Sequence, residues 1–426
     1  MKNRNKLKIA VVGLGYVGFP LAMEFAKKGV AVIGVEIDPG RLRAIKDRES
    51  YISDVSGKDL KNMLAAGKFS ATADFSRLKE CTAVLVCVPT PLKGKNLPDI
   101  SYIKDSLNSV ARHIQKGALV VLESTTYPGT TEEEILPIFQ KHNLRHGRDF
   151  FLCFSPERID PGNRRFPVNK IPKVVGGINA EATALAVSLY KIIIGKVVPV
   201  SSPRAAETVK LLENTFRLIN IGLIDELAMM CHKMKIDIWE VISAASTKPF
   251  GFMPFYPGPG VGGHCIPKDP LYLYWKAKSF GFRSRFIKLA SDVISYMPEY
   301  VVARMREAFL MKNLKIKGAR ILVVGATYKK DVKDLRQSPS IEILKCLEAN
   351  GAEAAYFDPL IPYLKVNRIK LKSIVLKGIS LRKFDCVIIA TDHSEIDYGY
   401  LLHNARLIFD TRNVYRGRGG DKVMVL

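Results

Sequence analysis

Cys265 lies in the stretch Gly258–Pro270, GPGVGGHCIPKDP, and is a candidate nucleophile. A cysteine is reactive when it is accessible and partly deprotonated, because the thiolate is the attacking form. The glycines let a substrate approach the backbone, and the prolines limit the freedom of the segment. Lys268 would favour the thiolate, and Asp269 can position a water molecule. The alternative is an inert core cysteine, but such a residue is seldom found in Gly-Gly-His-Cys beside two charges.

Two further groups of polar residues are candidates for chemistry. Lys210 and Asn214 are four residues apart, so they would project from one face of a helix and could hold an oxyanion near the thiol. Glu157 and Arg158 belong to SPERIDPGN, a proline-bounded loop after the strand FFLCF. Such loops, at the carboxyl ends of strands, carry the chemistry of α/β folds. The alternatives, a surface lysine with a polar neighbour and a salt-bridged turn, remain open for both groups.

A dinucleotide fingerprint stands near the N-terminus. The glycines of GLGYVG, Gly13, Gly15 and Gly18, follow an apolar strand and open a helix. In this pattern they allow a tight turn, close approach of a pyrophosphate and close helix packing. Glu36 ends the next strand, where a carboxylate can accept hydrogen bonds from both ribose hydroxyls and would repel a 2′-phosphate. The pattern therefore predicts NAD rather than NADP.

The elements around these residues alternate between strands and helices. TAVLVCVPTP and ALVVLESTTYPGTT read as buried strands, and Thr131 with Glu134 suggests a capping box on the helix that follows. From Pro203, with Ser202 as its cap, apolar residues recur at helical spacing for about 30 residues. This segment would be a spine between two lobes.

A weak internal repeat defines the second lobe. KGARILVVGATY echoes KLKIAVVGLGYVG, and AEAAYFDP echoes VAVIGVEIDP, although only Gly325 of the glycine pattern is kept. Strands that alternate with helices imply parallel sheets. We therefore expect an α/β fold of two doubly wound, Rossmann-like lobes joined by a long central helix. The expected domains are 1–200 for NAD, 201–312 for the helical centre with the cysteine loop, and 313–426 for the second Rossmann-like lobe.

The composition narrows the class of protein. Of the 426 residues 47% are hydrophobic and 25% charged, with no apolar run long enough to span a membrane. Seven scattered cysteines without CxxC pairs argue against a disulfide framework or a zinc cluster, so we expect a cytoplasmic setting and no metal. The net charge of +24 favours anionic partners. A concentrated basic face is missing from the sequence, so we expect neither nucleic-acid binding nor membrane insertion.

The order of the motifs resembles one family over nearly the whole chain. GLGYVG, VPTP, ESTTYPGTT, SPERIDPG, ETVKLLENTFR, GPGVGGHCIPKDP, GATYKKDVKDLRQSP and DTRN are similar to the UDP-glucose/GDP-mannose dehydrogenase family. SPERIDPG and DTRN, with ATDH before the last strand, resemble the branch that acts on UDP-N-acetylhexosamines, GlcNAc or ManNAc. UDP-glucose and GDP-mannose remain alternatives. So do an inactive scaffold of the same fold and, outside enzymes, a polyanion-binding protein.

The resemblance implies a role for each matching residue. Cys265 would be the nucleophile, Lys210 would transfer protons and hold the oxyanion with Asn214, and Asp269 would help to activate water. The residues that would contact NAD are Gly13, Gly15, Tyr16, Val17, Gly18, Glu36, Arg41, Thr90, Thr125 and Arg336. Those that would bind the UDP-sugar are Arg158, Ile159, Lys210, Asn214, Arg217, Gly262, Tyr328, Lys329 and Arg412. Glu36 departs from the family's more usual aspartate.

The implied reaction is a four-electron oxidation of C6 with two NAD. The first hydride transfer gives an aldehyde, which Cys265 captures as a thiohemiacetal. The second gives a thioester, and water releases the acid. The long helix also carries apolar residues, Leu218, Ile221, Leu223 and Met229, beyond one simple stripe. Because related enzymes pair through this helix, we expect a homodimer or a larger assembly of dimers.

Overall fold

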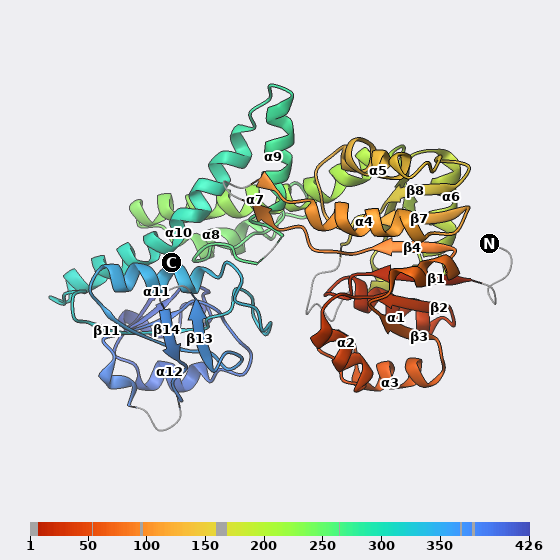
Figure 1. Ribbon diagram of the computed structural model, residues 1–426. Coiled ribbons are helices and arrows are strands. Elements are labelled where there is room, and N and C mark those ends of the chain that lie inside the picture. The colour runs from red at the N-terminus through yellow and green to blue at the C-terminus, as the bar shows by residue number, and fades with distance from the viewer. Residues whose placement is uncertain are drawn as a thin grey trace. The chain divides into compact units, whose positions relative to one another are not determined.

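The structure is a computed structural model that describes residues 7–52, 54–93, 97–158, 168–263, 265–366, 369–376 and 380–426. The chain divides into two compact units. The first contains the residues up to Glu213 together with Leu271–Phe282, and the second contains Asn214–Pro270 with Arg283–Leu426. Each unit holds its own mainly parallel sheet (Figure 1). No helix in the described ranges is long and apolar enough to cross a membrane.

The first unit is built on an eight-stranded sheet of order β10-β9-β8-β7-β4-β1-β2-β3. All neighbours are parallel except the pair β8 and β9. The strands are β1 (Lys8–Val12), β2 (Ala31–Val35), β3 (Phe69–Thr72), β4 (Ala83–Val86), β7 (Ala118–Leu122), β8 (Phe150–Phe154), β9 (Lys173–Gly177) and β10 (Val197–Pro199). Its helices include α1 (Gly18–Lys27), α2 (Pro39–Lys46), α3 (Gly57–Ala65), α4 (Ser101–His113), α5 (Leu136–Lys141) and α6 (Ala180–Tyr190). The short strands β5 (Leu92–Lys93) and β6 (Leu97–Pro98) form a separate hairpin.

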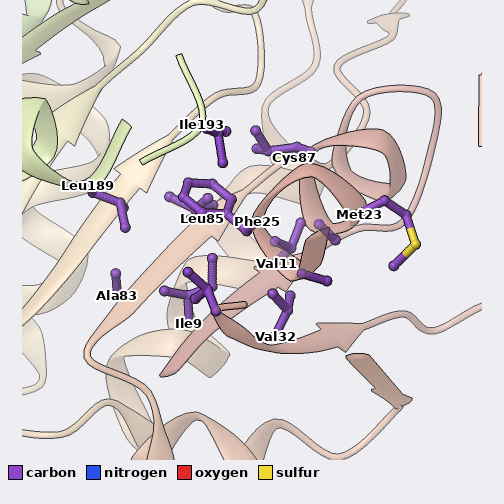
Figure 2. Close-up of a cluster of buried hydrophobic side chains, with 14 of the residues drawn as sticks. Ile9, Val11, Met23, Phe25, Val32, Ala83, Leu85, Cys87, Leu189 and Ile193 are labelled. Atoms are coloured by element: carbon purple, nitrogen blue, oxygen red, sulfur yellow. The ribbon is translucent and has the colours of Figure 1, made fainter. Parts of the chain in front are cut away.

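The core of this unit explains the apolar runs of its strands. Figure 2 shows Val11 of β1 and Leu85 of β4 in one buried cluster with Phe25 of α1 and Leu189 of α6. All four side chains are almost fully buried. A parallel sheet that is covered on both faces buries nearly every strand residue, and each such side chain contributes roughly 2 kcal/mol through its burial.

The long helix is α7 (Pro203–Lys233), with 31 residues. Ser202 caps it as predicted, because its Oγ accepts a hydrogen bond from the backbone N of Ala205 at 3.1 Å. Leu218 is buried, while the side chain of Leu223 is 51% exposed. The prediction of a helix of about 30 residues is confirmed.

The second unit carries a five-stranded, fully parallel sheet of order β12-β11-β15-β16-β17. The strands are β11 (Arg320–Val324), β12 (Glu353–Phe357), β15 (Cys386–Ile389), β16 (Ile408–Asp410) and β17 (Val423–Val425), with the hairpin β13 (Tyr363–Val366) and β14 (Ile369–Lys372). The remaining α-helices of the described residues are α8 (Ile238–Ala245), α9 (Asp269–Ser279), α10 (Arg285–Met311), α11 (Pro339–Ala349) and α12 (Tyr398–Asn404). The predicted fold, two doubly wound lobes and a long central helix, is confirmed.

In both sheets the first strand lies between the second and a later strand, at β1 and at β11. In doubly wound folds, ligands bind outside the carboxyl ends of the strands at this switch point. The segments that follow β1, β4, β11 and β15 are therefore the expected ligand-binding segments.

One local prediction is wrong. Thr131 and Glu134 form no capping box, and the chain opens there with a short π-helix (Thr131–Ile135). The backbone N and the Oγ of Thr131 instead donate to Oε1 of Glu207, at 2.9 and 2.7 Å. The Glu134 carboxylate pairs with Lys104 at 2.6 Å. A buried carboxylate from α7 thus replaces the local partner.

Candidate active site

The turn after β1 requires glycine at two positions. Gly13 has a φ of +89°, and a Cβ on it would lie 2.8 Å from the carbonyl oxygen of Cys87. Gly18 begins α1, and a Cβ there would lie 2.0 Å from the carbonyl oxygen of Gly13. Both distances are too short for a side chain, so the packing of strand, turn and helix depends on these glycines.

Gly15 is the point where a ligand can approach this turn. Among the described residues, a Cβ on Gly15 would meet one atom within 4 Å, Nη1 of Arg41 at 4.0 Å. Tyr16, 50% exposed, and Val17 complete the turn before α1 begins at Gly18. A helix N-terminus offers N–H donors and the positive end of its dipole to phosphates. The predicted NAD contacts in this turn therefore fit a dinucleotide.

Glu36, directly after β2, is buried and accepts four N–H groups. Its Oε2 accepts from the backbone N of Leu14 at 2.9 Å and from Nη1 of Arg41 at 3.0 Å. Its Oε1 accepts from the backbone N of Ile37 at 2.9 Å and of Asp38 at 3.1 Å. Besides its predicted role toward the ribose, Glu36 ties the glycine turn to β2 and neutralises Arg41.

Thr90 and Thr125 follow β4 and β7 at the same edge of the sheet. Thr90 is buried, and its carbonyl oxygen accepts a hydrogen bond from the hydroxyl of Tyr272 at 2.5 Å. Thr125 is half-buried. The turn of Gly13–Gly18 lies at this edge too, so the first unit gathers its predicted NAD contacts at the carboxyl ends of β1, β2, β4 and β7.

Glu207 supports the loop that follows β7, and the sequence reasoning missed it. It is fully buried, and its Oε2 accepts from the backbone N of Gly129 at 2.6 Å, while its Oε1 accepts from Thr131. These bonds hold the end of the loop that begins at Thr125. Burial raises the pKa of Glu207 to about 7 despite these donors. The signal available in the sequence was a glutamate among the apolar residues of the predicted long helix.

The SPERIDPG segment holds a second buried charge cluster. Lys173 of β9 lies 2.5 Å from Oε2 of Glu123 and 3.0 Å from Oε2 of Glu157. Burial opposes the charge of Lys173, but the two glutamates keep its pKa above the usual value. Arg158 pairs with Glu213 at 2.6 Å and donates through Nη1 to the carbonyl oxygen of Pro172 at 2.7 Å. Ile159 lies outside the described residues.

Lys210, Asn214 and Arg217 lie on α7. Lys210 is buried, Asn214 is half-buried and Arg217 is exposed. Asn214 Nδ2 donates to Oδ2 of Asp269 at 2.5 Å, which joins two of the predicted catalytic residues in the second unit. Asp269 is the first residue of α9 and is buried.

The cysteine loop presents its thiol to solvent. Cys265 is the one exposed cysteine of the seven, and Cys153 and Cys231 are buried, as expected of packing residues. The carbonyl oxygen of Cys265 accepts hydrogen bonds from the backbone N of Lys268 at 3.1 Å and of Asp269 at 2.8 Å. Burial and the positive charge of Arg336 lower the pKa of Lys268.

The glycines before Cys265 have a packing reason that the sequence did not reveal. A Cβ on Gly262 would lie 2.5 Å from Cβ of Tyr328, and one on Gly263 would lie 2.7 Å from its ring. The backbone N of Gly263 also donates to the carbonyl oxygen of Arg336 at 2.8 Å. The cysteine loop therefore packs directly on the segment that follows β11.

Arg412 lies near the start of the cysteine loop. Its Nε donates to the carbonyl oxygen of Ala390 at 2.8 Å, and its Nη1 lies 2.8 Å from where a Cβ of Gly258 would stand. The backbone N of Gly258 donates to Oδ1 of Asp225 at 3.0 Å. Burial raises the pKa of Asp225, a residue the sequence reasoning missed, to about 8.

Tyr328 and Lys329 are half-buried in the segment between β11 and α11, and Arg336, in the same segment, is exposed. The guanidinium of Arg336 pairs with Asp334 at 2.6 Å. The second unit thus brings Asn214, Asp269, the cysteine loop, Tyr328 and Arg412 into one connected set of contacts. In the described part of the chain, no group of three or more His, Cys, Asp or Glu side chains could hold a metal ion.

The comparisons with known proteins agree with this geometry. Three models of the UDP-glucose/GDP-mannose dehydrogenase family match: the NAD binding domain at residues 7–194, the central domain at 204–294 and the UDP binding domain at 322–417. A UDP-N-acetyl-D-glucosamine 6-dehydrogenase of Pseudomonas aeruginosa is 40% identical over 83% of each chain. The solved UDP-D-ManNAc dehydrogenase of Pyrococcus horikoshii is 32% identical, with a TM-score of 0.89 over 98% of this chain and 99% of that one.

A third similar protein is named for a different epimer of the N-acetylhexosamine sugar. The structure of an NDP-N-acetyl-D-galactosaminuronic acid dehydrogenase from Methanosarcina mazei has a TM-score of 0.84 and 29% identity, over 99% of this chain and 94% of that one. Sequence, fold and the gathered contacts therefore lead to the same assignment. The chain belongs to the UDP-glucose/GDP-mannose dehydrogenase family and is an NAD-dependent nucleotide-sugar dehydrogenase.

Proposed function

We propose that this enzyme oxidises C6 of a UDP-N-acetylhexosamine, GlcNAc or ManNAc, to the uronic acid. The observation that carries the proposal is Cys265, the one exposed thiol, in a loop that packs on Tyr328 and is joined through Asp269 to Asn214. The names of the relatives at 30–40% identity support this substrate class. UDP-glucose and GDP-mannose are the rival substrates.

The chemistry follows from the residues in the second unit and on α7. The Gly13–Gly18 turn would hold NAD, which would supply the hydride acceptor for each of the two oxidations at C6. Between them, the Cys265 thiolate adds to the aldehyde carbon, a C–S bond forms and the carbonyl electron pair moves to oxygen. Lys210 and Asn214 stabilise this oxyanion. Water finally attacks the thioester, the C–S bond breaks, and the thiolate returns as the acid is released.

The second unit supplies the orientation for these steps. Asp269 accepts the Asn214 amide at 2.5 Å, so the carboxylate is held where it can activate the hydrolytic water. Lys268, whose pKa burial lowers, stands three residues after the thiol and favours its ionised form. Arg158, Ile159, Arg217, Gly262, Tyr328, Lys329 and Arg412 are the proposed UDP-sugar contacts, with the arginines and Lys329 suited to phosphates.

The assembly and the compartment are proposed on separate grounds. Phe216, Leu223 and Met230 of α7 are exposed and recur at seven-residue spacing, which suits burial against a second copy of the chain. We therefore propose a homodimer or an assembly of dimers. A strictly monomeric mass in light scattering at micromolar concentration would contradict the dimer.

All seven cysteines are thiols in the structure, which suits a reducing compartment such as the cytoplasm.

The test of function is the NADH yield with a panel of sugar nucleotides. We expect two NADH per sugar acid, with little released aldehyde, from UDP-GlcNAc or UDP-ManNAc. UDP-GalNAc, UDP-glucose and GDP-mannose are the comparison substrates. A yield of one NADH, with aldehyde as the sole product, would contradict the double oxidation. Higher kcat/KM for UDP-glucose or GDP-mannose would select a rival substrate.

A further inference from the structure

The segment between β11 and α11 has to be held by something other than regular secondary structure. It carries Tyr328 and Lys329, the proposed UDP-sugar contacts, and runs without a helix or strand until Pro339. Asp331 adopts a φ of +57° and Gln337 of +50°, which are unfavourable for residues with side chains. Such a conformation persists only where the surroundings fix it.

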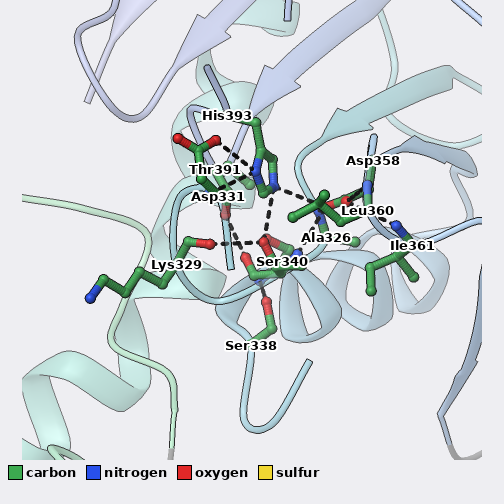
Figure 3. Close-up of polar contacts among 12 residues, drawn as sticks. Ala326, Lys329, Asp331, Ser338, Ser340, Asp358, Leu360, Ile361, Thr391 and His393 are labelled. Carbon is green, nitrogen blue, oxygen red and sulfur yellow. Dashed lines mark hydrogen bonds and ion pairs between the residues drawn. The ribbon is translucent and has the colours of Figure 1, made fainter. Parts of the chain in front are cut away.

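The buried imidazole ring of His393 contacts this segment and holds it in place (Figure 3). Its Nδ1 accepts a hydrogen bond from the backbone N of Asp331 at 3.0 Å. Its Nε2 lies 3.1 Å from Oδ2 of Asp358 and 2.9 Å from Oγ1 of Thr327. Since a backbone N–H can only donate, Nδ1 must be unprotonated, and the hydrogen of the neutral ring sits on Nε2.

Asp358 sets the orientation of this ring. Its Oδ2 accepts from the backbone N of Ala326 at 2.6 Å and of Thr327 at 3.1 Å, and its Oδ1 accepts from the backbone N of Leu360 at 2.8 Å. Burial opposes ionisation, but the hydrogen bond from His393 and these backbone donors hold the pKa of Asp358 below its usual value. The carboxylate is therefore fixed by the backbone and can hold the imidazole in one tautomer.

The contacts of the ring extend to both functional parts of the segment. Thr327 Oγ1, beside Nε2, also donates to the carbonyl oxygen of Lys329 at 3.0 Å. Tyr328 packs on Gly262 and Gly263, next to Cys265. A displacement of residues 327–334 would therefore move Lys329 and remove the support of the cysteine loop.

We propose that His393 is a positioning residue, which holds residues 327–334 through its Nδ1 and Nε2 and so presents Lys329 and Tyr328 to the UDP part of the substrate. His393 contacts the segment, not the substrate. The proposal rests on the proposed function, because it takes Lys329 as a UDP contact.

Three substitutions separate the contacts of the two ring nitrogens. His393→Asn keeps an acceptor near the place of Nδ1, His393→Gln keeps a donor near the place of Nε2, and His393→Phe removes both. We expect His393→Phe and His393→Gln to weaken the binding of UDP alone by about tenfold in calorimetry. His393→Asn should stay within about threefold of the wild type, because the backbone N of Asp331 keeps its acceptor.

Hydrogen exchange reports on the same bond without any ligand. The amide of Asp331 should exchange faster in the Phe and Gln variants than in the Asn variant. Thr327→Val leaves the imidazole in place and removes only the hydroxyl that joins it to Lys329. Should the His393 variants fail to fold, this variant still tests the path, with UDP binding expected to weaken about threefold.

Tyr415→Phe is the matched control. It removes one partly buried hydrogen bond of the same lobe, from the hydroxyl to the carbonyl oxygen of Tyr398 at 3.0 Å. It should lower the melting temperature while the Kd for UDP stays unchanged. Loss of stability with unchanged UDP affinity in the Phe and Gln variants, or in Thr327→Val, would overturn the positioning role alone. Wild-type protein that bound no UDP would overturn the proposed function and this inference with it.

Discussion

The two lobes begin with the same turn and use it differently. Gly13 and Gly325 have φ of +89° and +86°, and the backbone N of each donates at 2.8 Å to the last carbonyl of the neighbouring strand, at Val35 and at Phe357. In both lobes the carboxylate after that strand binds the next backbone N–H of the turn: Glu36 binds Leu14, and Asp358 binds Ala326.

The difference begins two residues later. In the first lobe Gly15 leaves open space and α1 begins at Gly18. In the second lobe the same position is Thr327, whose hydroxyl meets His393. Side chains thus occupy the place where the first lobe can receive a pyrophosphate. One backbone turn can serve as a cofactor cradle or as an anchor for a loop, and the residue in the second glycine position decides which.

The largest expected effect is that of Cys265→Ser, which should stop the oxidation while both lobes still bind their ligands. In Cys265→Ser the hydroxyl is a far weaker nucleophile, so turnover should fall by on the order of 10³-fold or more, about 4 kcal/mol of barrier. NAD and UDP should still bind in calorimetry, and an added aldehyde should not restore turnover. Cys153→Ser and Cys231→Ser are the controls, with far smaller effects. Near wild-type oxidation to the acid by Cys265→Ser would make the thiol structural.

The shared turn itself can be tested in both lobes. In Gly13→Ala and Gly325→Ala the new Cβ would meet backbone oxygens of Cys87 at 2.8 Å and Thr391 at 2.3 Å. Each should lower the free energy of unfolding by about 3 kcal/mol in urea denaturation. Gly29→Ala is the matched control, since Gly29 has a φ of +83° but no described atom within 4 Å of its Cβ. It should cost about 1 kcal/mol. Equal losses at all three positions would show that φ alone matters.

Two buried carboxylates should respond to pH in opposite directions. The folded pKa of Glu207 is raised to about 7, so its stabilisation is present below its unfolded pKa and is lost as pH rises through 7. Between pH 5 and pH 8 this should amount to about 2 kcal/mol of unfolding free energy. The folded pKa of Asp358 is lowered, so its stabilisation is lost only as pH falls below its unfolded pKa.

Denaturation curves from about pH 2 to pH 8 check this pair, because the unfolded pKa of an aspartate is about 3.9. Glu207→Gln should remove the loss above pH 5, and Asp358→Asn should remove part of the loss in acid. If Glu207→Gln kept the wild-type pH profile, the ionised carboxylate would be the stable form in the fold.

The smallest expected effect concerns cofactor choice. The wild type should prefer NAD over NADP by at least ~10-fold in kcat/KM, about 1.4 kcal/mol. In Glu36→Gln the negative charge is lost and Arg41 is released from its ion pair, so the preference should shrink. Asp358→Asn, in the second lobe, should leave it unchanged. Comparable use of both cofactors by the wild type would refute the role of Glu36.

The sequence was sufficient for the parts of the molecule that local patterns determine. The strand, glycine turn and helix at Gly13–Gly18, the Ser202 cap and the second lobe at Gly325 were all predicted. Residues whose partners are distant along the chain were not. His393 reaches back to Thr327, and Glu207 to Thr131, where it displaces the predicted capping box. A capping box is a local rule, and here a buried carboxylate from a distant part of the chain accepts the same N–H instead.

Because Cys265 is the one exposed cysteine of the seven, a thiol reagent can be used to titrate it selectively. Five cysteines are buried and Cys346 is half-buried, so an electrophile of moderate size should modify Cys265 first. A chromogenic disulfide reagent would then measure the concentration of the exposed Cys265 thiol, the proposed nucleophile, in a preparation without any substrate. The same selectivity marks Cys265 as the position where a covalent inhibitor, guided by a uridine group, would form its bond.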